Sequence, residues 1–185
     1  MKKIIILLSL ISSLFADAKV YLGSSYGVFE EKFTNDIEAE SSTDIAKIKA
    51  GYGVREAYAV EISFEYIKNK TKIFSSDAQT ALDGDKYGIN VDLIKAFDYD
   101  VYVLPFIKAG FGSGYFNINR KLQNRLFYGS FNLATGIFIP INETFDFELG
   151  YEYKHTSYES VDTIVEKIKY ESDTNIVYFG FNVRF

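Results

Sequence analysis

The sequence has no cysteine, and beyond its first residues it has no long apolar run. Without cysteine the chain can form no disulfide, and it cannot be a lipoprotein attached through a lipid-modified cysteine. The longest apolar stretch, residues 4–15, falls short of the roughly 20 residues that a membrane-spanning helix needs. Basic residues number 20 against 25 acidic ones, so no basic patch for nucleic acid is indicated. These absences exclude a disulfide-stapled fold and a helical membrane protein.

The first 18 residues have the three parts of a secretory signal peptide. Lys2 and Lys3 precede the apolar stretch, and Ala16 and Ala18 follow it with the small-residue spacing of a cleavage site. We therefore predict a signal peptide over residues 1–18, cleaved after Ala16 or Ala18. The remainder, residues 19–185, has the length of a single domain.

Aromatic residues are abundant, with 15 Tyr and 17 Phe, and they alternate with small and polar residues. In residues 177–185, VYFGFNVRF, every second side chain is Val or Phe, and the others are Tyr, Gly, Asn and Arg. A period of two is that of a β-strand whose faces meet different surroundings. Eight segments share this pattern, and each is long enough to cross a bilayer as a tilted strand: 19–29, 44–54, 57–68, 86–97, 101–116, 127–139, 145–155 and 174–185.

Each segment has one apolar row and one row of small and polar residues, and these second rows together hold both the glycines and the charges. A soluble barrel would turn the apolar row inward, and a membrane barrel would turn it outward. Small residues between long charged ones suit a narrow interior, whereas a water-facing surface has no need of so many glycines. We therefore predict that the charged row faces the interior and forms buried ion pairs: Glu61, Glu65, Lys108, Glu148, Glu152, Lys154 and Arg184.

Short and long connections alternate along the whole chain. This order predicts an all-β fold, an eight-stranded antiparallel up-and-down transmembrane β-barrel, with both termini and the short turns at one end. The short turns are 55–56, 98–100 and 140–144, and the long loops are 30–43, 69–85, 117–126 and 156–173. Aromatic residues at the ends of the apolar rows predict two interfacial girdles: Tyr26, Phe29, Tyr66, Tyr87, Tyr115, Phe127 and Tyr153 near the long loops, and Tyr52, Tyr58, Phe97, Tyr99, Phe145 and Phe185 near the short turns.

With these features the chain resembles the small eight-stranded outer-membrane barrels of Gram-negative bacteria, the group of the opacity proteins and the transmembrane half of outer membrane protein A. The stretches VLPFIKAGFGSGY and FDFELGYEY are similar to middle and penultimate strands of that family. The resemblance implies periplasmic termini, extracellular long loops, contact with outer-membrane lipids and lipopolysaccharide, a monomer and no cofactor. It also implies that the terminal row is the signal read by the barrel-assembly machinery: Phe179, Phe181, Val183 and Phe185.

Three functions remain open for such a barrel. We expect a structural or surface-binding, adhesin-like role through the four long loops, with no catalytic residues. The first alternative is an esterase, because His155 and Ser157 resemble the His–Ser pair of the lipid A 3-O-deacylases. That family usually has Asn after its serine, where Tyr158 stands here, and the orienting acid is open among Glu159, Glu166 and Glu171. The second alternative, a narrow channel, is disfavoured because eight strands leave room mainly for side chains.

The terminal residue supplies a first prediction. Deleting Phe185, or replacing it with aspartate, should reduce assembly into the outer membrane and leave export intact, because the apolar row of the last segment runs to the final carboxylate. The measurement is the amount of protein in outer-membrane fractions that shows the heat-dependent gel mobility of a folded barrel. Normal amounts of folded variant would show that Phe185 is no assembly signal.

Overall fold

The computed structural model describes residues 18–33, 43–68, 83–118, 124–162 and 167–185. The predicted signal peptide and a part of each long loop lie outside these residues, so the cleavage site stays a prediction. Eight long strands run up and down in chain order: β1 (Lys19–Phe33), β2 (Thr43–Val54), β3 (Tyr58–Ile67), β4 (Lys86–Ala96), β5 (Leu104–Asn117), β6 (Arg125–Pro140), β7 (Phe145–Tyr158) and β10 (Glu171–Arg184).

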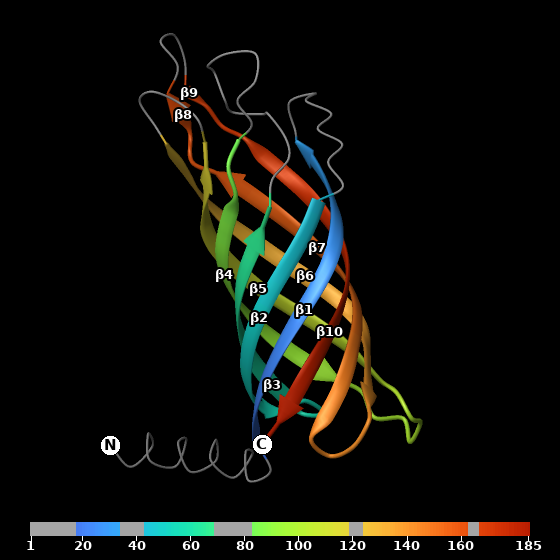
Figure 1. The fold of residues 1–185 in the computed structure, drawn as a ribbon. Coiled ribbons are helices and arrows are strands. Elements are labelled where there is room, and N and C mark those ends of the chain that lie inside the picture. Colours follow the sequence, from blue (N-terminus) through green and yellow to red (C-terminus); the bar gives the residue numbers. More distant parts are fainter. Residues whose placement is uncertain (1–17, 34–42, 69–82, 119–123, 163–166) are drawn as a thin grey trace, which may run out of the picture.

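These strands form one closed antiparallel barrel in the order β1-β10-β7-β6-β5-β4-β3-β2, which confirms the predicted fold class. The barrel closes where β1 pairs with β10, from Tyr21 opposite Arg184 to Phe33 opposite Ser172. The pairing reaches the last residue, since the Phe185 amide donates to the Val20 carbonyl at 2.8 Å. In Figure 1 the carboxyl terminus lies at the end of the barrel that carries the short connections, and the long connections leave the opposite end.

The strands depart from the predicted elements at several connections. β5 begins at Leu104 instead of residue 101, because the chain turns at Asp100, whose φ is 57° and whose amide donates to the Asp98 carboxylate. Residues 156–173 were predicted to be a loop, but β7 and β10 extend into them. Between these strands β8 (Val161–Asp162) and β9 (Lys167–Ile168) form a small antiparallel pair.

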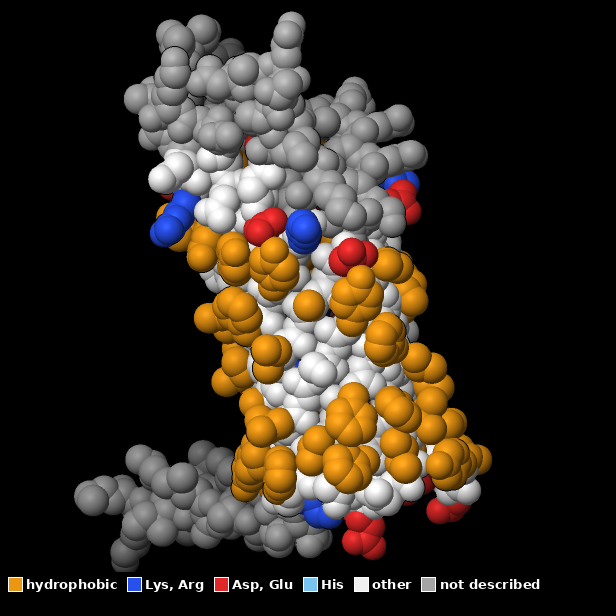
Figure 2. Space-filling model, in the orientation of Figure 1, with side chains coloured by type: hydrophobic (Ala, Val, Ile, Leu, Met, Phe, Trp, Pro, Cys, Tyr) orange, Lys and Arg blue, Asp and Glu red, His pale blue; other side chains and the backbone are white. Residues whose placement is uncertain are grey.

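Alternation along each strand separates an apolar outer face from a polar inner face. On β3, Ile62 is 55% exposed on the outside and its neighbour Ser63 is 2% exposed on the inside. Figure 2 shows hydrophobic side chains spread over the outer wall, with charged side chains gathered at its two ends. Among the described residues, no helix has the length and apolar character needed to cross a membrane.

The outer face carries aromatic side chains toward both ends, as a membrane barrel requires. Near the long connections, the rings of Tyr66, Tyr87 and Tyr115 follow one another across β3, β4 and β5 with centroids 5.3 Å apart at each step. Phe29 was predicted to belong to this row, and that assignment is wrong. It has the parity of Gly23 and Gly27 on β1, so it points inward, where it is 5% exposed and belongs to a core cluster with Ile45 and Ile176.

The outward apolar face generates a second prediction. Ile62→Arg places a cation near the middle of β3, at the level where the bilayer is driest, and should lower the free energy of unfolding by about 2–4 kcal/mol. The matched control is Ile141→Arg, the same substitution in the exposed turn after β6, which should cost much less. Urea titration of both variants in lipid vesicles measures the difference, and equal losses would contradict the assigned membrane level.

Candidate functional site

The interior of the barrel is the first candidate site, because it gathers most of the buried charge. The inward rows deliver lysines from β2 and β5 and carboxylates from β3 and β7, and strand alternation places charges at positions i and i+4 on the same inner face. Six of the seven predicted interior charges are buried there, and Arg184 lies at the short-turn mouth. Sequence reasoning left Lys47, Lys49 and Asp92 out of that set, although they have the same parity.

Glu148 is the centre of the first ion-pair group and has 0% exposure. It pairs with Lys49 and with Lys108, at 2.8 Å from the latter, and it accepts a hydrogen bond from the Tyr178 hydroxyl at 2.8 Å. Lys108 also donates to Glu61 at 3.0 Å, and Glu61 accepts from the Tyr21 hydroxyl at 2.9 Å. Two lysines therefore face two glutamates, which compensates charge that would be costly to bury alone.

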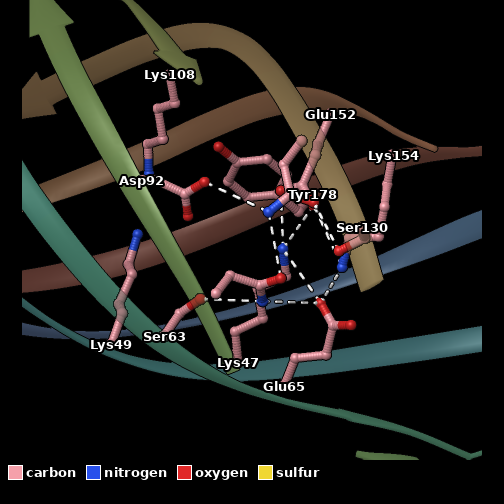
Figure 3. A network of polar contacts seen from close by, with 12 residues as sticks. Lys47, Lys49, Ser63, Glu65, Asp92, Lys108, Ser130, Glu152, Lys154 and Tyr178 are labelled. Carbon is pink, nitrogen blue, oxygen red and sulfur yellow. Dashed lines mark hydrogen bonds and ion pairs between the residues drawn. The ribbon is translucent and has the colours of Figure 1, made fainter. Parts of the chain in front are cut away.

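A second group lies nearer the long connections and is built from Glu65, Lys154, Lys47 and Glu152. Lys154 pairs with Glu65, and Lys47 donates to both carboxylate oxygens of Glu152 at 2.7 and 2.8 Å. The Asn90 amide donates to Glu65 at 3.3 Å, so a neutral side chain adds to the carboxylate's partners. Figure 3 shows these side chains reaching into the interior from different strands of the barrel wall.

Glycines in the inner row make room for two tyrosine rings. A Cβ at Gly51 would overlap the Tyr21 ring, and a Cβ at Gly150 would overlap the Tyr178 ring. The two tyrosines are therefore held against bare backbone, from which their hydroxyls reach Glu61 and Glu148. This close approach explains why glycine and charge share one face of the strands.

Apolar clusters close the interior on both sides of the charged groups. Toward the short turns, the rings of Phe106 and Phe138 pack against each other at a tilt, with centroids 4.5 Å apart. Toward the long connections, Phe116, Leu126 and Tyr158 pack together. The alternating pattern alone did not reveal these plugs, since their members share the inner face with the charges.

A further buried ion pair sits among the aromatic side chains at the long-connection end. Lys86 donates to both oxygens of Glu31 at 2.6 and 2.7 Å, and to the Tyr158 hydroxyl at 2.8 Å. Neither Lys86 nor Glu31 was among the predicted interior charges, because Glu31 was assigned to the loop that follows β1. The strand continues to Phe33, and its parity brings Glu31 inside.

Little empty space remains inside the barrel. Two cavities lie among the charged groups, and each measures about 10 Å³, room for about one water molecule. In the described parts of the chain, no three His, Cys, Asp or Glu side chains gather as a metal site would require. The interior therefore offers packing and paired charge, with no space for a solute.

The second candidate site lies on the outer wall, on the neighbouring strands β7 and β10. His155 is about half exposed, and its Nδ1 lies 2.8 Å from an oxygen of Asp173, its register partner on β10. The same carboxylate accepts from the Tyr153 hydroxyl at 2.6 Å. Ser157 is exposed on the same face of β7, and no hydrogen bond joins it to His155 among the described contacts.

The acid beside His155 is therefore none of the three that were proposed. Glu171 lies opposite Ser157 in the β7–β10 register, Glu159 follows the end of β7, and Glu166 lies outside the described residues. Asp173 could have been found by pairing the two segments as antiparallel neighbours, which requires the register and not the local sequence.

The terminal row lies on the outer face of β10. Phe179, Phe181 and Phe185 are exposed, and the Phe181 ring packs against Phe145 and Phe147 on β7 with centroids 5.5 and 5.7 Å apart. Val183 is part of the same face and is partly covered. The row is thus available on the outside of the barrel next to the closing seam.

Comparisons with known proteins agree with this architecture. Residues 4–185 match the family model described as "Outer membrane protein beta-barrel domain". No curated protein sequence matches the chain. Among solved structures, Neisserial surface protein A is similar at a TM-score of 0.67 and 16% identity, over 91% of this chain and 99% of that chain.

Two further structures have the same fold. The N-terminal β-barrel domain of Pseudomonas aeruginosa OprF gives a TM-score of 0.54 at 14% identity, over 88% of this chain and 97% of that one. Outer membrane protein AlkL, determined in lipid bilayers, gives 0.53 at 12% identity, over 89% and 90%. At such identities these likenesses concern the fold alone.

The ion-pair group around Glu148 supplies a third prediction. Glu148→Gln leaves Lys49 and Lys108 with Glu61 as their one shared carboxylate partner, and should lower the free energy of unfolding by about 3–5 kcal/mol. The control Glu30→Gln removes the same charge from an exposed pair with Lys32 and should change stability little. Urea unfolding in lipid vesicles compares the two, and equal midpoints would show that the buried pairs do not stabilise the barrel.

Proposed function

The chain belongs to the outer membrane protein β-barrel domain family of Gram-negative bacteria, and on that premise we propose that it is a surface-binding, adhesin-like protein that acts through its four long loops. We place the barrel in the outer membrane with its long loops extracellular and both termini periplasmic. The barrel is a monomeric scaffold surrounded by outer-membrane lipids and lipopolysaccharide. It has no cofactor and no enzymatic activity of its own.

The filled interior is the observation that carries this proposal. Charged groups and apolar plugs leave cavities of about 10 Å³, so a solute has no path through the barrel as it stands. A barrel without a passage can act at its ends or on its outer wall. The narrow channel is therefore the weakest of the three functions.

Three features support the long-loop end as the working surface. All four long connections join strands at the same end of the barrel, because the eight long strands run up and down in chain order. One of these loops contains the acidic, polar stretch NDIEAESST at residues 35–43. The opposite end carries short turns, which offer much less surface. We also propose that the outer row ending at Phe185 serves the barrel-assembly machinery, as the family resemblance implies.

Adherence tests the surface-binding function. The protein, displayed on a non-adherent laboratory strain, should raise attachment to host-cell and abiotic surfaces, and replacing residues 69–82 or 35–42 with a short turn should reduce it. The matched control replaces the residues of the short turn 141–144, which lie at the other end of the barrel. Unchanged attachment by barrels with shortened long loops, present in normal amounts, would rule out the loops as the binding surface.

One observation favours a second candidate, a lipid A deacylase. Asp173 holds His155 in the way that the acid of a catalytic triad orients its base, and Ser157 follows two residues later on the same outward face. Side chains two residues apart on a strand are separated by roughly 6–7 Å along it, so proton transfer would require the side chains to lean together. Contact with lipid on the outer wall would supply the ester substrate.

Lipid A mass spectra separate the two candidates. We expect identical acylation in cells with and without the protein, because His155 and Ser157 are not joined by a hydrogen bond among the described contacts. Loss of acyl chains that disappears with Ser157→Ala, His155→Ala and Asp173→Asn would establish the enzyme instead. Thr156→Ala, an inward-facing neighbour, is the control for effects on folding.

A further inference from the structure

A further cavity lies at the short-turn mouth of the barrel and is distinct from both candidate sites. It measures about 220 Å³, against about 10 Å³ for each cavity inside. Three cationic side chains line it, from Lys19 at the start of β1, Arg55 in the β2–β3 turn and Arg184 at the end of β10. Glu56 is the one acidic residue in its lining.

Arg55 is a turn residue whose side chain folds back into the barrel and is 5% exposed. Its guanidinium lies between the rings of Tyr21 and Phe138, at 4.3 and 4.1 Å from their centroids. Nη1 donates to Asp146 at 2.8 Å, which fixes one side of the group. Nε and Nη2 have no hydrogen-bond partner within the described residues, although buried N–H groups normally have one.

The other charges of the mouth do not satisfy these donors. Asp146 already accepts from Asn182 at 2.7 Å, and its Oδ2 also lies 3.2 Å from Arg184 Nε, so one carboxylate stands between two guanidinium groups. Lys19 forms no ion pair with any residue that the structure describes. The mouth therefore has three cationic side chains around an open cavity, and one of them, Arg55, keeps two buried donors without a partner within the described residues.

We propose that this mouth binds an oxyanion, a phosphate or carboxylate group, among the three cationic side chains that line it, those of Arg55, Arg184 and Lys19. A guanidinium presents its N–H groups as a planar fork, which matches the spacing of oxygens in such anions. The stacked rings hold this fork in place before the ligand arrives, so little side-chain freedom is lost on binding. The anion has two possible sources, a soluble phosphate or carboxylate, and the headgroup of an anionic phospholipid in the adjoining leaflet.

The test follows the arginine side chains directly. The processed barrel, with ¹⁵N-labelled arginine, is placed in nanodiscs of phosphatidylcholine and titrated with inorganic phosphate, while NMR records the Nε–H signals of its four arginines. The Nε–H signals of Arg55 and Arg184 should shift with increasing phosphate until they reach a plateau. The signal of Arg125, which lies at the other end of the barrel against the Tyr115 ring, should not shift. Absence of saturation, or an equal shift at Arg125, would overturn the proposal.

Variants test the contribution of each donor. Arg55→Lys keeps the charge, removes the fork and should weaken phosphate binding about tenfold. Lys19→Gln, at the exposed rim, should weaken it about threefold and keeps the test available where the buried variant does not fold. Lys32→Gln is the control, since it removes the same charge at the opposite end of β1. Unchanged affinity in Arg55→Lys and Lys19→Gln would exclude the mouth as the site.

The same titration distinguishes the two sources. In nanodiscs that contain phosphatidylglycerol, loss of the phosphate-induced shifts identifies the lipid headgroup as the occupant, and retention of the shifts identifies a soluble anion. Because the measurement uses the isolated barrel, its failure would not bear on the function of the long loops.

Discussion

The backbone of a membrane-spanning chain must find all its hydrogen-bond partners within the protein, and the rest of this structure depends on that constraint. A sheet with open edges would leave two rows of unpaired N–H and C=O groups in hydrocarbon, so β1 and β10 pair along their length, up to the Phe185 amide. Closure with eight strands fixes a narrow interior. In such a narrow interior, inward-facing side chains must be small, or their charges must be compensated by ion pairs.

Inward charge is compatible with this interior because the strands place opposite charges within contact of one another. Lys49 on β2 pairs with Glu148 on β7, and Lys108 on β5 pairs with Glu61 on β3. Neither pair joins adjacent strands, so both form through the interior of the barrel. A register slip of one residue would send such groups to the lipid face and the outer apolar row to the interior. The ion pairs therefore help to select the correct register over registers shifted by one residue. Contact of the apolar row with lipid would select it less strongly without them.

The sequence was sufficient for the features that depend on alternation. Parity predicted the inside and outside of every long strand, and loop lengths predicted the up-and-down order. The failures occurred where local pattern competes with tertiary position. Phe29 was taken for a girdle residue because it is aromatic and near a loop, Arg55 was treated as an ordinary turn residue, and Asp173 was missed because it meets His155 only through the β7–β10 register. Pairings across the interior depend on barrel geometry, which period-two patterns do not contain.

Sequence separation within the ion-pair groups also bears on how the barrel forms. The partners Lys49 and Glu148 are 99 residues apart, and Lys47 and Glu152 are 105 apart, so neither pair exists in any hairpin of adjacent strands. The β2–β3 hairpin contains pairs of its own, Lys47 with Glu65 and Lys49 with Glu61. A hairpin of β7 with β6 or β10, in contrast, would carry Glu148 into hydrocarbon without Lys49 and Lys108, at a high free-energy cost. Contacts of such long range also close slowly, since distant segments must meet before any pair is made. Insertion by successive hairpins is therefore unfavourable for β7, whose buried glutamates meet their lysines only when the barrel closes.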